Sequence, residues 1–443
     1  MFVEPINHVP PSPPRTHGAT QEKSISKPAA ITAITVGSGL ELYESVVYNF
    51  FATLIGPLFF PSADVFTQTL LSFATFGIGY VMRPLGGLLV GRYADRVGRK
   101  PAVILTLWLM GLSSLILVLT PTYAQIGMLA PVLVVFAKLL QGFAIGGEMG
   151  PAAAMLMEYA DDRNRGFYIS WQPFSQGLAA VLAALVALAL SSFLSPESLS
   201  SFGWRLAFVI GIMVIPVSVV IRSRLDETLI KPKPKAGAVK QASGMSVMRD
   251  NWRLLLAGML LMIGLSSAIH IVVFYLPNYA VLRLHIPLSK TIWAGLVSSL
   301  ILAALSPLSG WLSDQIGRRK VVLFSRLALL AVAYPAFALL NAEPTLKRLL
   351  LVTACLAVPM TMTAASTLVL VSEILPRHLR ATGLSVTYYG AVVIFGSFAQ
   401  FFSTILIHAT GNVNAPAFYL IACGLLSLIG LLMVPETLGK KLS

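Results

Sequence analysis

Long apolar runs alternate with short polar turns from about residue 29 to about residue 436 of this 443-residue chain. A helix that crosses the hydrocarbon core of a membrane needs about 20 largely apolar residues, and the apolar runs have this length. Twelve such helices would use about 240 residues, so little of the chain is left for a domain outside the bilayer. The pattern predicts an all-α membrane protein with 12 transmembrane helices.

The polar turns set the expected limits of the helices and of the larger units. We expect spans that include 29–60, 67–90, 125–157, 166–189, 254–279, 292–312, 321–340, 349–371, 381–407 and 415–434. The expected units are a flexible cytoplasmic tail (1–28), an N-terminal six-helix bundle (29–223), a cytoplasmic linker loop (224–252), a C-terminal six-helix bundle (253–436) and a cytoplasmic tail (437–443).

A repeated motif relates the two halves of the chain. The glycines, the aspartate and the basic pair of the turn at 91–100 return 219 positions later, in the turn at 310–319. A second echo at a similar period pairs Glu158 and Arg165 with Glu373 and Arg380. Internal repetition of this kind is typical of transporter folds, so we expect two pseudo-symmetric bundles.

The composition agrees with a membrane protein. Hydrophobic residues make up 56% of the chain and charged residues 11%, with a mean hydropathy of +0.80, which is too apolar for a soluble domain. The polar, proline-rich segment 1–28 lacks the apolar core of a signal peptide. Cys355 and Cys423 lie within apolar runs, so we expect two buried thiols and no disulfide.

The net charge of +14 would suit a nucleic-acid partner, but the distribution of the charges argues against one. Of the 32 lysines and arginines, 25 lie in the tails, the linker and the loops expected on one side of the membrane. The outer loops hold four: Arg283, Lys290, Lys347 and Arg348. By the positive-inside rule both termini are expected in the cytoplasm, with the basic segment 231–235 along the anionic inner leaflet.

Glu41 and Glu44 are acidic residues within the first expected span. They lie three residues apart, so they share one helical face, at a depth where a charge costs about 2.5 to 3.5 kcal/mol. Two carboxylates this close should not both ionise readily, so they are candidates for proton coupling. The alternative is a pair of structural polar residues hydrogen-bonded to a neighbouring helix.

Two buried cations are candidates for contact with an anionic substrate. Arg83 precedes a proline in the second span, and the alternative for it is snorkelling to the membrane surface. Lys138 shares a helical face with Gln141 in the fourth span, and Glu148 lies lower on that span, where a structural ion pair with Arg83 is plausible.

Polar side chains on other spans complete the candidate substrate site. Trp171, Gln172 and Gln176 begin the fifth span, and the two glutamines share a face that lines a cavity or packs against a helix. Tyr275 and Tyr388 are neutral hydrogen-bonding candidates in the second half. His270 is either a hydrogen-bonded core residue or a proton relay. The ionisable groups gather in the first half, so we expect charge recognition there and shape selection opposite.

Motifs of soluble enzymes are missing from the sequence. It has no Walker A loop, no dinucleotide-binding glycine pattern, no His-Glu-x-x-His and no Cys-x-x-Cys. We therefore expect a transporter that is not an enzyme, needs no metal or cofactor, and uses the proton as its coupling ion.

Several short motifs resemble the major facilitator superfamily and, within it, the metabolite:proton symporter family. The motifs are the turn at 91–100 with its repeat at 310–320, Arg83-Pro84-Leu85-Gly86-Gly87, Gln141-Gly142-Phe143, Gly146-Gly147-Glu148, Arg165-Gly166-Phe167, Gly203-Trp204-Arg205 and Glu227-Thr228. The stretch 166–176 is most similar to citrate and related carboxylate symporters. The segment 41–45 departs from the family pattern, because Leu42 and Ser45 stand where the family has aromatic residues and Glu44 where it has aspartate.

The resemblance implies two six-helix bundles that rock about a central site. Asp95 would accept hydrogen bonds from the start of the eleventh span, beside Arg380, and Asp314 from the start of the fifth span, beside Arg165. Such contacts would close the cytoplasmic face. The expected gating residues are Asp95, Arg99, Arg165, Asp314, Arg318 and Arg380.

The function expected from these observations is proton-coupled import of a small carboxylate. A di- or tricarboxylate such as citrate is the first expectation, and the protein would act as a monomer in the lipid bilayer of the bacterial plasma (inner) membrane. The alternatives are a zwitterionic osmolyte such as betaine or proline, or another organic acid such as 2-oxoglutarate or shikimate. An exporter and a non-transporting receptor are the other classes.

Overall fold

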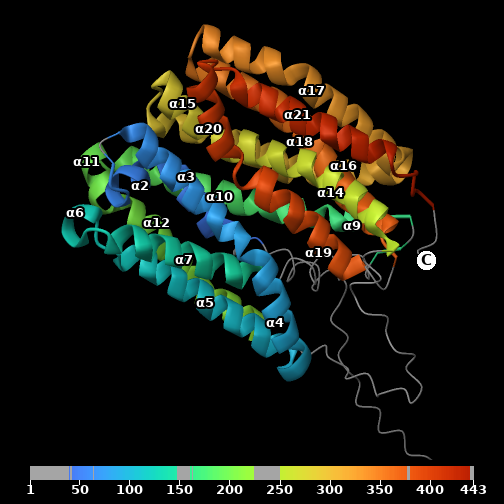
Figure 1. Ribbon diagram of the computed structural model, residues 1–443, viewed down its shortest axis with the longest axis horizontal. Helices are drawn as coiled ribbons and strands as arrows, with labels where there is room; N and C mark the ends of the chain where they lie inside the picture. The colour runs from blue at the N-terminus through green and yellow to red at the C-terminus, as the bar shows by residue number, and fades with distance from the viewer. Residues whose placement is uncertain are drawn as a thin grey trace, which may run out of the picture.

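The computed structural model describes residues 39, 42–62, 64–146, 160–161, 163–223, 250–376 and 380–439. Within this part of the chain, every regular element is helical, and most helices run side by side along one direction (Figure 1). The first half contains helical residues 42–50, α2 (Ala52–Phe59), α3 (Val65–Val81), α4 (Arg83–Val97), α5 (Arg99–Leu119), α6 (Tyr123–Ile126), α7 (Leu129–Gly146), α9 (Arg165–Ile169), α10 (Trp171–Phe193), α11 (Pro196–Ser198), η1 (Leu199–Gly203) and α12 (Trp204–Ser223).

The second half has longer and more regular helices. They are α14 (Trp252–Ile269), η2 (His270–Tyr275), α15 (Leu276–Leu284), α16 (Leu288–Ile316), α17 (Arg318–Ala342), α18 (Leu346–Ile374), α19 (Arg380–Ala391), η3 (Val392–Gly396), α20 (Ala399–Thr410) and α21 (Ala415–Leu432). The segments η2 and η3 are π-helical turns, which often mark functional sites in helices. The turn η2 connects α14 to α15, and η3 lies between α19 and α20. Each of these two series of elements therefore forms one long, nearly continuous helix.

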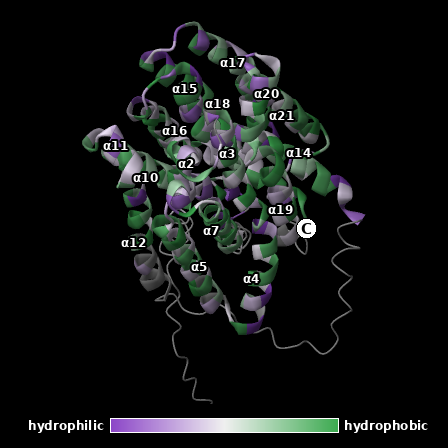
Figure 2. Cartoon of the chain, turned by 60° about the vertical axis from the view of Figure 1, so that its left-hand side comes forward, coloured by the Kyte–Doolittle hydropathy of each residue, from purple (hydrophilic) through white to green (hydrophobic). Residues whose placement is uncertain are grey.

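The described helices confirm the membrane-spanning architecture. Among the described residues, nine continuous helical stretches, some of which combine two or three labelled elements, are long and apolar enough to cross a bilayer. The helices at 42–59, α5 and α12 supply the other three spans of the predicted 12. Some helices extend about one turn beyond the predicted apolar run at each end, because a helix can continue into the headgroup region. One example is α16 (Leu288–Ile316), for which the expected span is 292–312. Figure 2 shows mostly apolar colour along the lengths of the helices.

The two halves of the chain lie on different sides of the molecule. In Figure 1 the blue and cyan helices α3, α4, α5 and α7 gather on one side, and the yellow to red helices α14 to α21 on the other. The main contacts between the halves are those of α9 and α10 with α16. A site that both halves line therefore lies along this interface.

Glycines bring α7 very close to α3 and α4. A Cβ on Gly142 would collide with the Gly79 carbonyl, and one on Gly146 would collide with the carbonyl of Arg83. Small residues at such positions let membrane helices pack backbone against backbone. The contact fixes the backbone of Arg83 against α7, so the glycine motifs hold this cation in place.

The structure corrects two expectations about individual residues. Cys355 is exposed on α18, whereas Cys423 is buried as expected. The sequence pattern gives only the apolar character of α18, and the direction of each side chain depends on how the helix is rotated in the bundle. Arg326 is one of the 25 basic residues that the charge count assigns to the cytoplasmic tails, linker and loops. It lies fully buried within α17, where its Nη1 donates to the Gly264 carbonyl at 2.6 Å.

Candidate functional site

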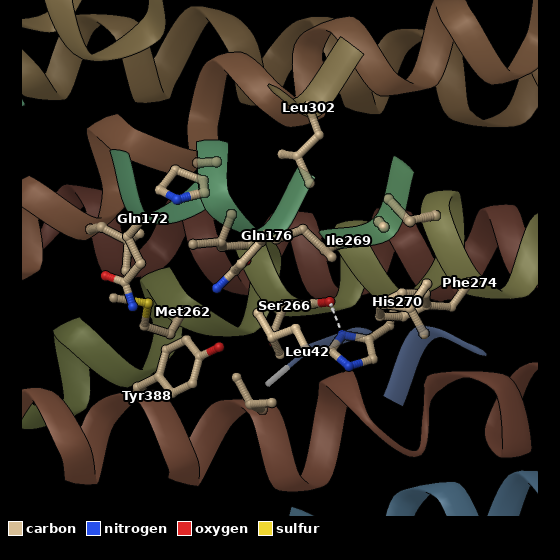
Figure 3. Close-up of a pocket in the computed structure, with 18 of the residues that line it drawn as sticks. Leu42, Gln172, Gln176, Met262, Ser266, Ile269, His270, Phe274, Leu302 and Tyr388 are labelled. Atoms are coloured by element: carbon tan, nitrogen blue, oxygen red, sulfur yellow. Dashed lines mark hydrogen bonds between the residues drawn. The ribbon is translucent and has the colours of Figure 1, made fainter. Parts of the chain in front are cut away.

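A cavity lies between the two halves, and helices from both of them line it (Figure 3). Its polar wall consists of Tyr80, Arg83, Gln172, Gln176, Ser266, His270 and Tyr388. Apolar side chains supply the rest, among them Leu42, Val46, Met262, Phe274 and Leu302. A largely apolar cavity with a few convergent polar groups is the usual form of a small-molecule site.

Arg83 supplies the positive charge of the cavity wall. Its side chain is 2% exposed, and the guanidinium carbon lies 3.5 Å from the centre of the Tyr80 ring, a favourable cation–π arrangement. Among the described residues, no carboxylate forms an ion pair with Arg83, and its Nε has no hydrogen-bond partner. An anion in the cavity would meet a desolvated guanidinium, which is a strong carboxylate ligand.

Glu44, Gln141 and Lys138 form a separate buried chain of hydrogen bonds. Gln141 Nε2 donates to Glu44 Oε2 at 3.0 Å, and Lys138 Nζ donates to Gln141 Oε1 at 2.9 Å. Lys138 Nζ also lies 3.9 Å from the centre of the Tyr48 ring. None of the three residues lines the cavity, so Lys138 and Gln141 lie within the N-terminal bundle, away from the position expected of substrate contacts.

The remaining candidates for substrate contact divide between the cavity wall and positions away from it. Gln172, Gln176 and Tyr388 line the cavity. Trp171 does not, and it packs against Phe174 with ring centres 4.9 Å apart. Tyr275 lies behind the wall, where its hydroxyl accepts a hydrogen bond from Thr404 at 3.2 Å.

The sequence pattern did not single out Tyr80 or Ser266. Tyr80 stands three residues before Arg83, and this spacing puts both on one helical face, so the signal was present in the sequence. Glu41 and Glu148 lie outside the described residues. For Asp95, Arg99 and Arg380 the structure describes the backbone only.

Asp314 joins the two halves at one end of the interface. Its Oδ1 accepts from the Gly166 amide at 2.9 Å, and its Oδ2 accepts from the Phe167 amide at 2.8 Å. These amides lie at the N-terminus of the continuous helix formed by α9 and α10, where the helix dipole favours a negative charge. This is the contact that the sequence predicts between Asp314 and the start of the fifth span.

Buried ion pairs strengthen the same end. Arg165 Nη1 lies 3.2 Å from Glu373 Oε1, and Arg318 Nη1 lies 2.6 Å from Asp314 Oδ1. Arg318 also reaches Glu373, with Nε 3.4 Å from Oε2. All four side chains are at most 3% exposed, so each charge depends on its partners for compensation.

Two residues after the last helix join this network without having been expected there. Thr437 Oγ1 donates to Glu373 Oε2 at 2.6 Å. Glu436 accepts from the backbone amides of Arg318 and Arg319 at 3.0 and 3.1 Å. The Glu-Thr pair repeats Glu227-Thr228 of the first half, and this repeat was the available signal.

At the opposite end of the interface the halves meet through amide and aromatic side chains. Asn278 Nδ2 donates to the Asn49 carbonyl at 3.1 Å and to Asn49 Oδ1 at 2.9 Å. The rings of Phe66 and His408 stack with centres 4.3 Å apart. Contacts between the halves are therefore present at both ends of the cavity.

The Asp314 contact leads to a kinetic prediction. In Asp314→Asn, the lost charge leaves Arg318 less compensated and one new N–H faces the amides of α9, so closure of this end is weakened. We expect turnover to fall about tenfold or more, with KM within about threefold, because the change shifts the balance between states and not the substrate contacts. Initial uptake rates over a range of substrate concentrations measure both quantities.

Asp64→Asn is the matched control for this experiment. Asp64 also accepts two backbone hydrogen bonds at the start of a helix, from Phe66 at 3.2 Å and Thr67 at 3.0 Å. It is exposed, and its side-chain hydrogen bonds all stay within the first half, to Phe66 and Thr67. Asparagine caps helices as well as aspartate does, so turnover should stay near that of the wild type. A folded Asp314→Asn protein that has lost substrate binding would contradict the gating role.

Comparisons with known proteins agree with this architecture. The model of the Major Facilitator Superfamily matches residues 45–404. A citrate-proton symporter of Klebsiella pneumoniae is 34% identical over 402 residues, which cover 90% of each chain. A proline/betaine transporter of Salmonella typhimurium is 31% identical, over 93% of this chain and 84% of the relative.

The fold agrees as well. The chain is similar to the xylose transporter XylE of E. coli in a partially occluded inward open conformation, with a TM-score of 0.74 and 16% identity over 94% of this chain and 99% of that one. The family match, the identity to relatives and the helical architecture lead to one conclusion: this chain belongs to the Major Facilitator Superfamily, as a multi-pass integral membrane protein of its proton-coupled, metabolite:proton symporter type.

Proposed function

We propose that this protein imports a small carboxylate together with protons, and that the carboxylate is a di- or tricarboxylate such as citrate. The observation that carries the proposal is the guanidinium of Arg83, which is buried at the cavity wall and pairs with no described carboxylate. A buried cation needs compensating charge or hydrogen bonds, and an anionic substrate in the cavity would supply both.

The neutral groups of the cavity suit the same kind of substrate. An arginine can bind a carboxylate through two parallel hydrogen bonds. The amides of Gln172 and Gln176 and the hydroxyl of Tyr388 lie on the cavity wall and can donate to further carboxylate oxygens. The likeness to a citrate-proton symporter at 34% identity favours this class of substrate.

Glu44 is the proposed proton carrier. The helix at 42–50 touches both the cavity and the buried chain of hydrogen bonds, because Leu42 and Val46 line the cavity while Glu44 contacts Gln141. A side chain two positions along a helix points about 200° away, so one helix presents the two groups on opposite faces. Movement of this helix would therefore link the protonation of Glu44 to occupation of the cavity.

The proposed transport cycle is alternating access across the plasma membrane of a bacterium. The positive-inside rule puts the Asp314 end and both termini in the cytoplasm, and the Asn278 end outside. Breaking the Asp314 contacts would open the cavity inward, and breaking the Asn278 contacts would open it outward. Substrate and proton would shift the balance between these states through their different affinities for them.

A zwitterionic osmolyte is the second candidate substrate. Tyr80, Phe274 and Tyr388 line the cavity, and aromatic faces can hold a quaternary ammonium group. The likeness to a proline/betaine transporter at 31% identity points the same way.

A binding experiment distinguishes the two candidates. The melting temperature of the purified protein is measured with citrate, succinate, 2-oxoglutarate, shikimate, proline and betaine, since a ligand that binds the folded state raises it. We expect citrate or another carboxylate to raise the melting temperature. Stabilisation by betaine or proline with no effect of any carboxylate would contradict the proposal and favour the osmolyte.

A further inference from the structure

His270 stands at the start of the π-helical turn η2 and lines the cavity (Figure 3). Its side chain is 5% exposed, and Nδ1 lies 2.8 Å from the carbonyl oxygen of Ser266. A carbonyl oxygen can only accept a hydrogen bond, so Nδ1 carries the hydrogen. In the neutral ring this arrangement leaves a lone pair at Nε2.

No group that the structure describes uses this lone pair. The Nε2 atom is buried and has no hydrogen-bond partner. The ring cannot easily turn to find one, because the rings of Tyr80 and Phe274 lie 5.6 and 5.3 Å from it. On the side of η3, a Cβ added to Gly396 would lie 3.1 Å from the imidazole. The orientation of Nε2 is therefore fixed by packing.

The chemistry of His270 differs from that of the other polar residues on the cavity wall. Arg83 carries only donors, and the side-chain amides and hydroxyls on the wall can donate as well. These groups suit carboxylate oxygens, which only accept. An obligate acceptor gains nothing from a carboxylate, and an acceptor that is left unmatched weakens binding. Its natural partner is an O–H group on the substrate.

We propose that His270 Nε2 accepts a hydrogen bond from a hydroxyl group of the substrate, so that the site selects hydroxycarboxylates over the same acids without the hydroxyl. The inference rests on the proposed function, because it assumes that the substrate is a carboxylate. His270 is then a specificity-determining residue: the donors of the cavity recognise the carboxylates, and His270 recognises the hydroxyl.

The test compares two pairs of acids that differ only in one hydroxyl group. Citrate is paired with propane-1,2,3-tricarboxylate, and malate with succinate. Initial uptake into proteoliposomes with an inward proton gradient gives kcat/KM for each acid. For at least one pair we expect the hydroxy acid to be favoured about tenfold or more, which corresponds to one good hydrogen bond.

Substitutions assign the preference to His270. His270→Phe keeps an aromatic ring among its neighbours and removes the acceptor, so the ratio should fall to about one or two, through slower uptake of the hydroxy acid. The Ser266 carbonyl keeps its backbone hydrogen bond from residue 270. In His270→Gln the side-chain oxygen reaches the region of Nε2, so part of the preference should return. His285→Asn, a change at an exposed histidine that does not line the cavity, should leave the ratio unchanged, and asparagine suits the left-handed backbone at this position.

The outcomes show separately whether the role of His270 fails or the proposed transport of carboxylates fails. If carboxylates are accumulated but the wild type does not prefer the hydroxy acids, the proposed function stands and this inference is overturned. A full preference in His270→Phe overturns it as well. Loss of proton-driven accumulation of every acid in His270→Phe, with exchange retained, would make His270 a proton carrier instead. If no carboxylate is accumulated by the wild type, the proposed function fails and this inference with it.

Discussion

Replacing Arg83 by glutamine is expected to raise the dissociation constant of the transported carboxylate about 30-fold or more. The substitution removes a guanidinium that is 2% exposed, and truncating one partner of a buried charged pair costs about 2 to 5 kcal/mol. Each 1.4 kcal/mol changes the affinity about tenfold. Titration calorimetry on purified protein measures the change directly.

Two further variants sharpen this result. Arg83→Lys keeps the charge but loses the bidentate hydrogen-bonding geometry of the guanidinium. It should therefore bind the carboxylate more tightly than Arg83→Gln and more weakly than the wild type. Arg348→Gln is the control, because Arg348 forms an exposed ion pair with Glu343, and such pairs contribute at most about 1 kcal/mol. A folded Arg83→Gln protein with an affinity within about threefold of the wild type would exclude Arg83 as the carboxylate ligand.

Replacing Glu44 by glutamine is expected to abolish accumulation driven by a proton gradient. Glutamine keeps the size and hydrogen-bonding ability of the side chain next to Gln141, but it cannot gain and lose a proton in the working range of pH. Substrate exchange across the membrane without a gradient should continue, because Glu44 does not line the cavity. The measurement compares gradient-driven uptake with counterflow in the same proteoliposomes.

The control for this variant is Glu343→Gln, which changes the exposed carboxylate of the Arg348 pair. It should accumulate substrate as the wild type does. Full accumulation in Glu44→Gln would remove Glu44 from the coupling mechanism. Loss of both accumulation and exchange in a folded protein would mean that this carboxylate serves substrate binding or helix packing.

The sequence predicts the fold well because the physical requirement is simple. A helix needs about 20 apolar residues to cross the membrane, and each run of that length is visible in the chain. The contact between Asp314 and the amides of Gly166 and Phe167 was expected from the resemblance to the superfamily, and it is favourable because a carboxylate complements the positive end of a helix dipole.

The orientation of individual side chains was less predictable. Spacing puts Lys138 and Gln141 on one face of α7, and the structure joins them by a hydrogen bond. Spacing does not say whether that face turns towards the cavity or into the N-terminal bundle, because helix rotation depends on packing. The buried position of Arg326 in α17 was hidden for the same reason.

Two features that depend on distant segments were not foreseen. Glu436 meets the start of α17, more than 100 positions away in the chain, and its signal in the sequence was the repeat of Glu227-Thr228, which does not name the partner. His270 was noted as a buried residue with two possible roles, but its free Nε2 appears only when all its neighbours are in place.

Uptake by purified protein in proteoliposomes tests proton-coupled carboxylate import most directly. An inward proton gradient is imposed, and labelled citrate, succinate, 2-oxoglutarate, shikimate, proline and betaine are supplied in turn. We expect a carboxylate to accumulate above its outside concentration and a protonophore to abolish the accumulation. If the folded protein accumulates no carboxylate, or accumulates only betaine or proline, the proposed function is contradicted.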